Sequence, residues 1–465
     1  MLPPSPRILP AQAVETNHDG TKLDSDAWLI EILCWIQIVD RLVENFTMDM
    51  QPIRRARQDS IWDRKQETGP TMDAAKVMQT LISLSERAAN VARVVRSHSE
   101  LFESLIQEKD FDTRRKKSDF KTLADVTIQE TIRYFLGREF PYLGAQVRGE
   151  ETYGFTAKSG KFLSLQIVPN ASLMKDLFRG VLGGDEAAAV EITKAVYDDP
   201  DLSGIELDKA KSINLQLPED RFGVWVDPLD ATSEYINAGS ATARPPSHGV
   251  FLSGIHCVTI LIGVFDLKTG EPVAGVINQP FYHMDEHTKK WQSRCVWGIS
   301  YHGVNVNSQI RCERPLGTGK APVVILSPSE TNELKEALDE RFTTIYAAGA
   351  GYKFLSLLLG LADSYVLSRA TTFKWDSCAP HAILRSVGGG CCDLAKALVN
   401  FDLHSVQNNR KYELQYLHPD DPDRDATDCW LNEGGILAYA SLSDLAEIVA
   451  TLRQVMAEGV QLLES

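Results

Sequence analysis

The amino-acid sequence predicts a mixed α/β protein in two parts. Apolar residues recur at helical spacing between residues 77 and 106, which predicts one or two helices packed on a sheet. Residues 256–265 and 272–277 are apolar runs on either side of a turn and predict a hairpin. The apolar run at 323–326 precedes a turn and a helical stretch at 332–338, which marks the start of an α/β half. At 465 residues the chain has ample core for one large two-part domain or two domains.

The first 71 residues carry no motif that points to a chemistry. Prolines at positions 3, 4, 6 and 10 disfavour a helix at the start, and disorder is the expected state there. Residues 26–46 have the spacing of an amphipathic helix that either docks on the main domain or serves a partner or a membrane surface. We therefore expect an extension at 1–71, an N-terminal α+β half at 72–320 and a C-terminal α/β half at 321–465.

Charge and cysteine use exclude several classes of protein. The 48 basic and 63 acidic residues give a net charge of −15, which argues against a general binder of nucleic acid or membrane surfaces. An acidic protein that acts on an anionic substrate needs a local cationic site, which a bound metal ion would supply. The eight cysteines include no C-x-x-C pair and indicate reduced thiols. No basic-then-apolar signal segment is visible at the N-terminus, so we expect a cytoplasmic protein without membrane insertion.

Two acids three residues apart, Asp227 and Asp230, fall at a strand-to-helix turn. Residues 222–226 are typical of a short buried strand, and residues 233–236 can open a helix. The first helical N–H groups beyond Asp230 would then face an anion, because a helix start carries unpaired donors. Taken alone, the pattern is as compatible with a capped turn in which Asp230 is the N-cap.

The residues between these two acids give the turn a specific geometry. Pro228 fixes its own φ and disfavours a helical Asp227, so the turn can hold both carboxylates and the Leu229 carbonyl towards one point. Oxygen ligands of this kind suit Mg²⁺, which usually binds beside a substrate phosphate. The turn therefore predicts a magnesium site next to an anion.

Four further carboxylates fall at predicted element ends. Asp125 lies in the first turn of a predicted helix, where the helix dipole favours an acid in any case. Glu150 and Glu151 end a candidate strand and are either a surface pair or a metal ligand with a helper for a metal-bound water. Asp376 lies just before a helix that runs to Val387, where it is either an N-cap or a further ligand.

The remaining segments fit the same organisation. Residues 173–196 are helical in pattern, and residues 198–215 form an acidic, loop-rich insertion. Residues 290–291 and 296–300 predict a strand pair that extends the hairpin sheet.

A glycine-containing turn at residues 346–353 follows a predicted strand and opens an apolar helix. Its glycines are too few for a dinucleotide-binding fingerprint. The turn is either a tight turn with a surface lysine, or an anion site in which Lys353 reaches a second phosphate.

Taken together, the acids occur in the order Asp, Glu-Glu, Asp-Pro-Leu-Asp-Ala-Thr, Trp-Asp. This order resembles the signature of the magnesium-dependent, lithium-sensitive phosphatase superfamily that includes inositol monophosphatase and fructose-1,6-bisphosphatase. The resemblance runs from about residue 77 to the C-terminus, and its matching stretches are 120–125, 223–230, 257–264, 275–280, 347–353 and 371–378.

The resemblance implies a layered α/β/α/β/α sandwich of the sugar-phosphatase type, with the site between the two halves. It also implies two or three Mg²⁺ ions. Glu150, Asp227 and the Leu229 carbonyl would hold one ion, and Asp227, Asp230 and Asp376 the second. Two metal ions can activate a water molecule and stabilise the leaving oxygen, so no side-chain nucleophile is required.

Roles for the water and the substrate follow from the same resemblance. Asp125 paired with Thr232 would orient and deprotonate the attacking water, together with Glu151, which also belongs to the implied metal ligands. Asp230 and the backbone N–H groups of Ala231 and Thr232 would hold the phosphate. The implied contacts to the rest of the substrate are Ser329, Thr331, Gly349, Ala350 and Lys353. Two departures are visible: Ala231 stands where relatives usually have Gly or Ser, and Thr331 occupies a site that can be basic.

The implied activity is removal of the 1-phosphate from inositol 1,4-bisphosphate and inositol 1,3,4-trisphosphate by a monomeric, lithium-inhibited enzyme that binds no nucleic acid. The alternatives are a bisphosphate nucleotidase of the same superfamily and a non-catalytic inositol-phosphate binder. The context of residues 374–376 favours the inositol substrate, and the filled ligand positions disfavour a silent binder. A covalent aspartyl phosphatase is disfavoured because such enzymes usually have two acids that lie two residues apart, whereas Asp227 and Asp230 lie three apart with a proline between them.

Overall fold

The computed structural model describes residues 69–98, 105–108, 120–152, 154–156, 162–238, 246–308, 321–402, 410–417 and 428–457. All of them belong to one compact unit, Glu67–Glu464. The predictions for the first 68 residues, including the amphipathic helix at 26–46, lie outside the described residues. None of the helices in the described ranges combines the length and apolar composition that crossing a bilayer requires.

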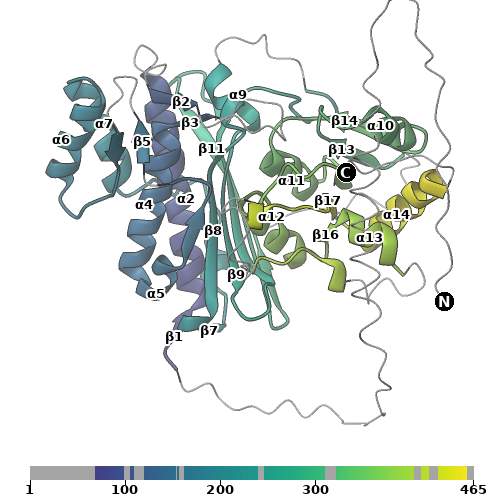
Figure 1. Cartoon of the computed structure of the whole chain (residues 1–465). Coiled ribbons are helices and arrows are strands. Elements are labelled where there is room, and N and C mark those ends of the chain that lie inside the picture. Colours follow the sequence, from purple (N-terminus) through teal and green to yellow (C-terminus); the bar gives the residue numbers. More distant parts are fainter. Residues whose placement is uncertain are drawn as a thin grey trace, which may run out of the picture. The chain divides into compact units, whose positions relative to one another are not determined.

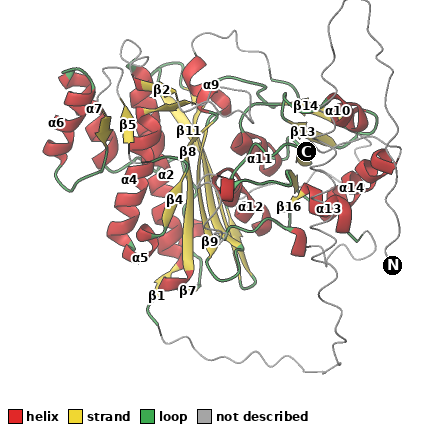
Figure 2. Cartoon of the chain, in the orientation of Figure 1, coloured by secondary structure: helices red, strands yellow, loops and turns green. Residues whose placement is uncertain are grey.

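The described chain combines helices and strands (Figures 1 and 2). The helices are α2 (Ala74–Ser97), α4 (Leu123–Glu139), α5 (Pro141–Ala145), α6 (Ala171–Val181), α7 (Glu186–Tyr197), α8 (Asp208–Lys211), α9 (Thr232–Asn237), α10 (Asn332–Asp339), α11 (Ala350–Leu358), α12 (Lys374–Ser386), α13 (Leu394–Asn400) and α14 (Leu442–Ala457). The strands are β1 (Thr71–Asp73), β2 (Ile106–Glu108), β3 (Phe120–Thr122), β4 (Val147–Gly149), β5 (Gly154–Thr156), β6 (Phe162–Ser164), β7 (Gln216–Pro218), β8 (Phe222–Asp230), β9 (Thr259–Asp266), β10 (Pro272–Met284), β11 (Trp291–Tyr301), β12 (Val304–Asn307), β13 (Val323–Leu326), β14 (Thr343–Tyr346), β15 (Ser364–Leu367), β16 (Gly390–Asp393) and β17 (Ile436–Tyr439).

A six-stranded sheet carries the first part of the site. Its order is β12-β11-β10-β9-β8-β4, and all its pairs are antiparallel except β4 with β8. Every residue of β8 is buried, because helices cover both faces of the sheet at this strand. Since β4 and β8 run in parallel, their carboxyl ends meet at one edge, which brings Glu150 close to the end of β8.

A five-stranded sheet carries the second part. Its order is β14-β13-β15-β17-β16, with β13 parallel to both β14 and β15 and the other two pairs antiparallel. The segments after β13 and β15 therefore leave the sheet at the same edge.

The helices complete five layers, as Figure 1 shows. Helices α2 and α4 cover one face of the six-stranded sheet, α11 and α12 lie between the two sheets, and α10, α13 and α14 cover the far face of the five-stranded sheet. Alternate residues of β13 show the two-sided burial, because Val323 and Ile325 pack towards α11 and α12 while Val324 and Leu326 pack towards α10 and α14. This arrangement confirms the predicted α/β/α/β/α sandwich.

Three cross-strand glycines form a track on which α12 lies. Gly275 pairs with Gly263 of β9 and with Gly298 of β11. A Cβ atom on Gly275 would lie 2.1 Å from the carbonyl oxygen of Ala379 in α12, and one on Gly263 would lie 2.5 Å from the Ala379 nitrogen. The missing side chains therefore let α12 approach the sheet backbone.

Two predicted elements differ in their division. The predicted strand pair at 290–291 and 296–300 is one continuous strand, β11. Its central residues are polar and pair with the end of β10, so the sequence pattern does not show that the strand is continuous. The helical stretch 173–196 is two helices, α6 and α7, because Gly183 and Gly184 break it with φ values of 66° and 99°.

Candidate active site

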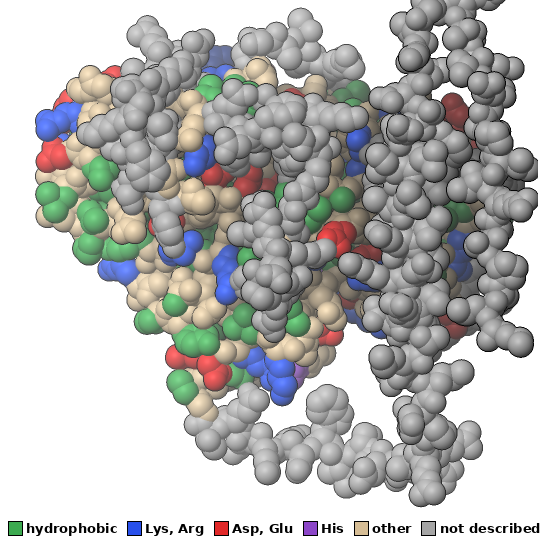
Figure 3. Space-filling model, viewed as in Figure 1, with side chains coloured by type: hydrophobic (Ala, Val, Ile, Leu, Met, Phe, Trp, Pro, Cys, Tyr) green, Lys and Arg blue, Asp and Glu red, His purple; other side chains and the backbone are tan. Residues whose placement is uncertain are grey.

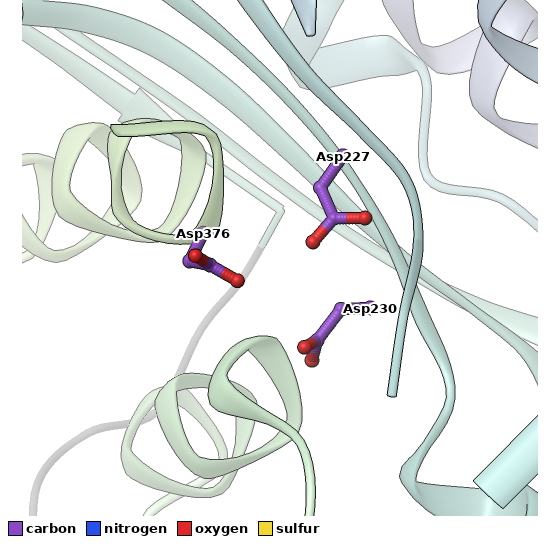
Figure 4. Close-up of side chains that lie close together, drawn as sticks. All are labelled: Asp227, Asp230 and Asp376. Carbon is purple, nitrogen blue, oxygen red and sulfur yellow. The ribbon is translucent and has the colours of Figure 1, made fainter. Parts of the chain in front are cut away.

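Three carboxylates from the six-stranded sheet and from helix α12, which packs on it, converge at one point (Figure 4). Asp227 and Asp230 come from β8 and Asp376 comes from α12, and each offers an oxygen within 4.8 Å of the others. They line a cavity of about 430 Å³ that also includes Glu150 and residues of the five-stranded sheet. A separate hollow of about 600 Å³ near the β1–β7 pair contains none of the predicted site residues.

A bulge lets the two acids of β8 point the same way. Residues three apart on a regular strand face opposite sides of the sheet. Here Asp227 pairs with Leu261 and Asp230 with Thr259, so β8 has one more residue than β9 between the two pairs. The extra residue falls in the Pro228-Leu229 segment, as the fixed φ of proline favours. This turn is the physical reason why the predicted D-x-x-D pattern forms a single site.

Asp227 lies at the centre of the negative charge. It is 1% exposed, and the Leu229 N–H donates to its Oδ1 at 3.1 Å. Burial, followed by the charges of Glu150, Asp230, Asp376 and Asp125, holds the pKa of Asp227 well above its usual range. Carboxylates gathered in this way repel one another, and a divalent cation removes the repulsion. The oxygen donors present fit Mg²⁺.

Asp230 is held by the start of another helix. The N–H groups of Ala350 and Gly351 in α11 donate to its two oxygens at 3.2 and 2.7 Å, and the Thr259 hydroxyl donates at 3.2 Å. The alternative in which Asp230 caps the following helix is wrong, because the N-cap of α9 is Ala231. Burial raises the pKa of Asp230, while Lys353 and these donors oppose the rise. The anion at the start of α11 is therefore a side chain of the protein itself.

Asp376 differs slightly from its predicted position. It lies inside the first turn of α12 rather than before the helix, and its Oδ2 accepts a hydrogen bond of 2.6 Å from the Phe373 N–H. The bond fixes the carboxylate against the helix start, where the macrodipole favours negative charge. The glycine track beneath α12 then sets how far Asp376 stands from β8.

The Glu150-Glu151 pair divides between the cavity and the interior. Glu150 lines the cavity, and its N–H donates to the Val226 carbonyl at 3.2 Å. Glu151 is 7% exposed and has its Oε2 4.0 Å from the Lys121 ammonium. Gln129 of α4 holds the Glu151 backbone at both ends, accepting from its N–H at 3.0 Å and donating to its carbonyl.

The predicted Asp125–Thr232 pair is present. The Thr232 hydroxyl lies 2.9 Å from the Leu229 carbonyl oxygen and 3.5 Å from Asp125 Oδ1. Asp125 is fully buried, and its Oδ2 accepts from both the N–H and the hydroxyl of Thr122 at 2.6 Å. Thr232 lines the cavity, while Asp125 lies behind it.

The backbone at Ala231 is left-handed, with φ 66° and ψ 44°. A residue with a Cβ atom has a cost of about 1 kcal/mol there, whereas glycine does not. Ala231 lines the cavity beside the acids in a conformation that glycine would adopt without this cost.

Most of the predicted substrate contacts line the cavity, but Thr331 does not. Ser329, Gly349, Ala350 and Lys353 all lie in its wall, together with Ala231 and Thr232. The Thr331 hydroxyl instead caps α10 by accepting from the Leu334 N–H at 3.3 Å. The Lys353 ammonium is buried and donates to the carbonyls of Ala347 and Gly349 at 3.2 and 2.8 Å. Burial lowers the pKa of Lys353, and Asp230 opposes this effect.

Three residues at the site were not predicted from the sequence. Thr259 and Gln129 act through side-chain contacts to Asp230 and Glu151 that no spacing reveals. Arg369 lines the cavity at the end of β15. A signal for Arg369 exists in the sequence, since it lies two residues after the apolar run 365–367. Elsewhere on the described face shown in Figure 3, acidic and basic side chains are interspersed.

The sequence is similar to proteins of known activity. The inositol monophosphatase family model matches residues 185–419. Inositol polyphosphate 1-phosphatase from Bos taurus is 40% identical over 407 residues, which is 82% of this chain and 98% of the bovine protein. The Homo sapiens enzyme of that name is 38% identical over 402 residues, again 82% of this chain and 98% of the relative.

A second group of relatives is more distant. A 3'(2'),5'-bisphosphate nucleotidase 1 from Mus musculus is 25% identical over 322 residues, covering 69% of this chain and 83% of the relative. The identity and the coverage are both higher for the inositol polyphosphate 1-phosphatases than for this nucleotidase. The chain belongs to the inositol monophosphatase family.

Proposed function

We propose that the protein is a Mg²⁺-dependent phosphatase that removes the 1-phosphate from inositol 1,4-bisphosphate and inositol 1,3,4-trisphosphate. The observation that carries the proposal is the convergence of Asp227, Asp230 and Asp376 in one cavity with Glu150 beside them. The choice of substrate is supported by the relatives named inositol polyphosphate 1-phosphatase, which match over nearly their whole length.

The residues assigned to Mg²⁺ are Glu150, Glu151, Asp227, the Leu229 carbonyl, Asp230 and Asp376, for two or three ions. When bound, the ions supply activation of water and stabilisation of the leaving oxygen. The protein's own contribution is to hold these oxygens in place before the substrate arrives. The backbone N–H groups that bind Asp227, Asp230 and Asp376 do this without neutralising their charge.

The proton from the attacking water passes to the Asp125–Thr232 pair in this proposal. The Thr232 hydroxyl lies within reach of both the Leu229 carbonyl and Asp125, so a rotation towards Asp125 frees its oxygen to accept from water. Glu151 would assist in the deprotonation of this water, as the family resemblance implies. The N–H groups at Ala231 and Thr232 would bind the transferred phosphate.

A cytoplasmic, monomeric and lithium-inhibited enzyme completes the proposal, on the basis of the family resemblance. A bisphosphate nucleotidase remains the alternative, with lower similarity over a smaller part of the chain. A non-catalytic binder is disfavoured because each implied ligand position carries its oxygen donor.

The test is phosphate release from inositol 1,4-bisphosphate by the purified protein with Mg²⁺, with a chelator, and with added Li⁺. We expect release that requires Mg²⁺, falls with Li⁺, and drops at least about 100-fold in Asp227→Asn, because a metal ligand is lost. Asp220→Asn removes an exposed acid outside the cavity and is the matched control.

Thermal unfolding gives a second readout that does not depend on turnover. Mg²⁺ should raise the Tm of the wild type and not that of Asp227→Asn. In the chelator, the variant should be the more stable of the two, because one of several repelling carboxylates is neutralised. Release without any divalent metal, or release from a nucleotide bisphosphate alone, would contradict the proposal.

A further inference from the structure

We propose that Arg369 binds the phosphate that stays on the substrate, and that it selects substrates with more than one phosphate. The inference rests on the proposed function, since it assigns a binding residue to the second phosphate of the same substrate. It begins from the distribution of charge around the cavity, which is uneven.

The cavity has two cationic side chains among its described lining residues, Lys353 and Arg369. Lys353 is 4% exposed, donates to two backbone carbonyls and lies close to Asp230, so its charge serves the acidic cluster. Arg369 is half-buried and belongs to the segment that follows β15. The guanidinium therefore marks the part of the wall where a second anion is favoured.

The position of Arg369 is fixed by the edge of the five-stranded sheet. Its Nη1 donates to the Ser329 carbonyl at 2.8 Å, and Ser329 lies on the turn after the parallel neighbour strand β13. Next to this contact, the buried Glu330 accepts from the N–H and the hydroxyl of Ser368. The two contacts connect the turn after β13 to the end of β15, and they fix the position of the Arg369 guanidinium.

The two walls of the cavity thus carry opposite charge. The acids that would hold Mg²⁺ come from β8 and α12, and Glu234 adds a further acid on the α9 side. Arg369 lies on the segment that follows β15 of the other sheet, together with the hydroxyl residues Thr371 and Thr372. A substrate with its reacting phosphate at the acidic cluster and its ring across the cavity would present a second phosphate to the Arg369 wall.

The chemistry of arginine suits this task. A guanidinium carries five N–H donors in a planar fork that matches two phosphate oxygens. The uncharged Thr331 on the turn after β13 does not line the cavity, and its hydroxyl caps α10. Arg369 provides the positive charge from a neighbouring turn.

The test compares the two products as inhibitors of inositol 1,4-bisphosphate hydrolysis. Inositol 4-phosphate carries the phosphate that stays on the ring, and inorganic phosphate is the one released. In Arg369→Gln, the KM for the bisphosphate and the Ki of inositol 4-phosphate should both rise roughly ten- to thirty-fold, because a charge-assisted contact is lost. The Ki of inorganic phosphate and kcat should stay within about threefold of the wild type, as expected for a contact made equally in ground and transition states.

Lys335→Gln is the matched control. The Lys335 ammonium donates to the Pro328 carbonyl at 3.0 Å, so this variant loses one positive charge and one bond to the same turn without altering the cavity wall. It should keep wild-type constants, and Arg369→Lys should give an intermediate rise because it keeps the charge but not the fork.

The outcomes separate the two proposals. Equal rises for both products, a rise of the same size in Lys335→Gln, or no change in Arg369→Gln would overturn the role of Arg369 while leaving the phosphatase in place. A wild-type protein that releases no phosphate from the bisphosphate would remove the proposed function and this inference with it.

Discussion

Four carboxylates of the site are each held by a backbone N–H group. The donors are Leu229 for Asp227, Gly351 for Asp230, Phe373 for Asp376 and Thr122 for Asp125. A neutral donor orients a carboxylate but leaves its charge in place. At the scale of the residue, the acids are therefore oriented by neutral donors, and the repulsion that remains between them favours a divalent cation.

Another buried acid, Glu130, stands apart from this cluster on α4. It is 4% exposed, and its Oε1 lies 3.4 Å from Arg133 Nε. Burial raises the pKa of Glu130 from its ordinary 4.5 to about 7, and Arg133 opposes the rise without cancelling it. The folded protein therefore binds a proton here that the unfolded chain releases at lower pH.

Glu130→Gln should stabilise the protein in a pH-dependent way. Below pH 4.5 the wild-type carboxyl is protonated in both states, so the two proteins should be equally stable. As the pH rises to about 7, the wild type loses stability and the difference should grow to about 1–3 kcal/mol. Urea unfolding at several pH values measures it. Glu139→Gln, at the exposed end of α4, is the control, and a difference that is independent of pH would refute the explanation.

At the scale of the element, α12 is the part on which the site depends most. It carries Asp376 at its start and lies against the glycines of β9, β10 and β11. Interiors are packed too densely to accept an added methyl group between two backbones. The distance between Asp376 and β8 is thus set by glycines that do not line the cavity with the acids.

Gly275→Ala should lower the free energy of unfolding by about 3 kcal/mol or more, because the new Cβ would lie 2.1 Å from the Ala379 carbonyl oxygen. It should also weaken Mg²⁺ binding by moving α12 outwards, which calorimetry with Mg²⁺ can measure. Gly180→Ala in α6, where a Cβ meets nothing within 4 Å, should be neutral or stabilising by up to about 1 kcal/mol. Equal effects of the two substitutions would rule out close packing of α12 as the cause.

At the scale of the whole molecule, the site is assembled by two sheets. The predicted acids Asp227, Asp230 and Asp376 lie together in the structure, and chain order could point to them because they occur near the end of a strand or the start of a helix. It could not predict which partner binds each acid, since Gly351 reaches Asp230 and Gln129 reaches Glu151 across long stretches of chain. The position of Arg369 was missed for the same reason, as it depends on the pairing of β13 with β15.

Residues before Gly69 should be dispensable for catalysis. All candidate site residues lie between Phe120 and Asp376, whereas Pro70 and β1 bond to the β7 segment and belong to the folded unit. A chain that begins at Gly69 should keep kcat and KM within about twofold and unfold at the same urea concentration. One that begins at Ala74 should lose about 1–2 kcal/mol with β1. Loss of activity in the longer chain with intact folding would show that the prediction is wrong.

The parallel pairing of β4 with β8 also bears on the order of folding. Strands β8 to β12 follow one another as antiparallel neighbours, whereas β4 joins β8 only after the long intervening segment has closed, with Val147 opposite Val224. Contacts between distant residues form late, because loop closure costs entropy before it is compensated. We therefore expect Glu150 to approach Asp227 only after strands β8 to β12 have paired. The repulsion between Glu150 and Asp227 would then arise late in folding, when the antiparallel strands of the sheet are already paired.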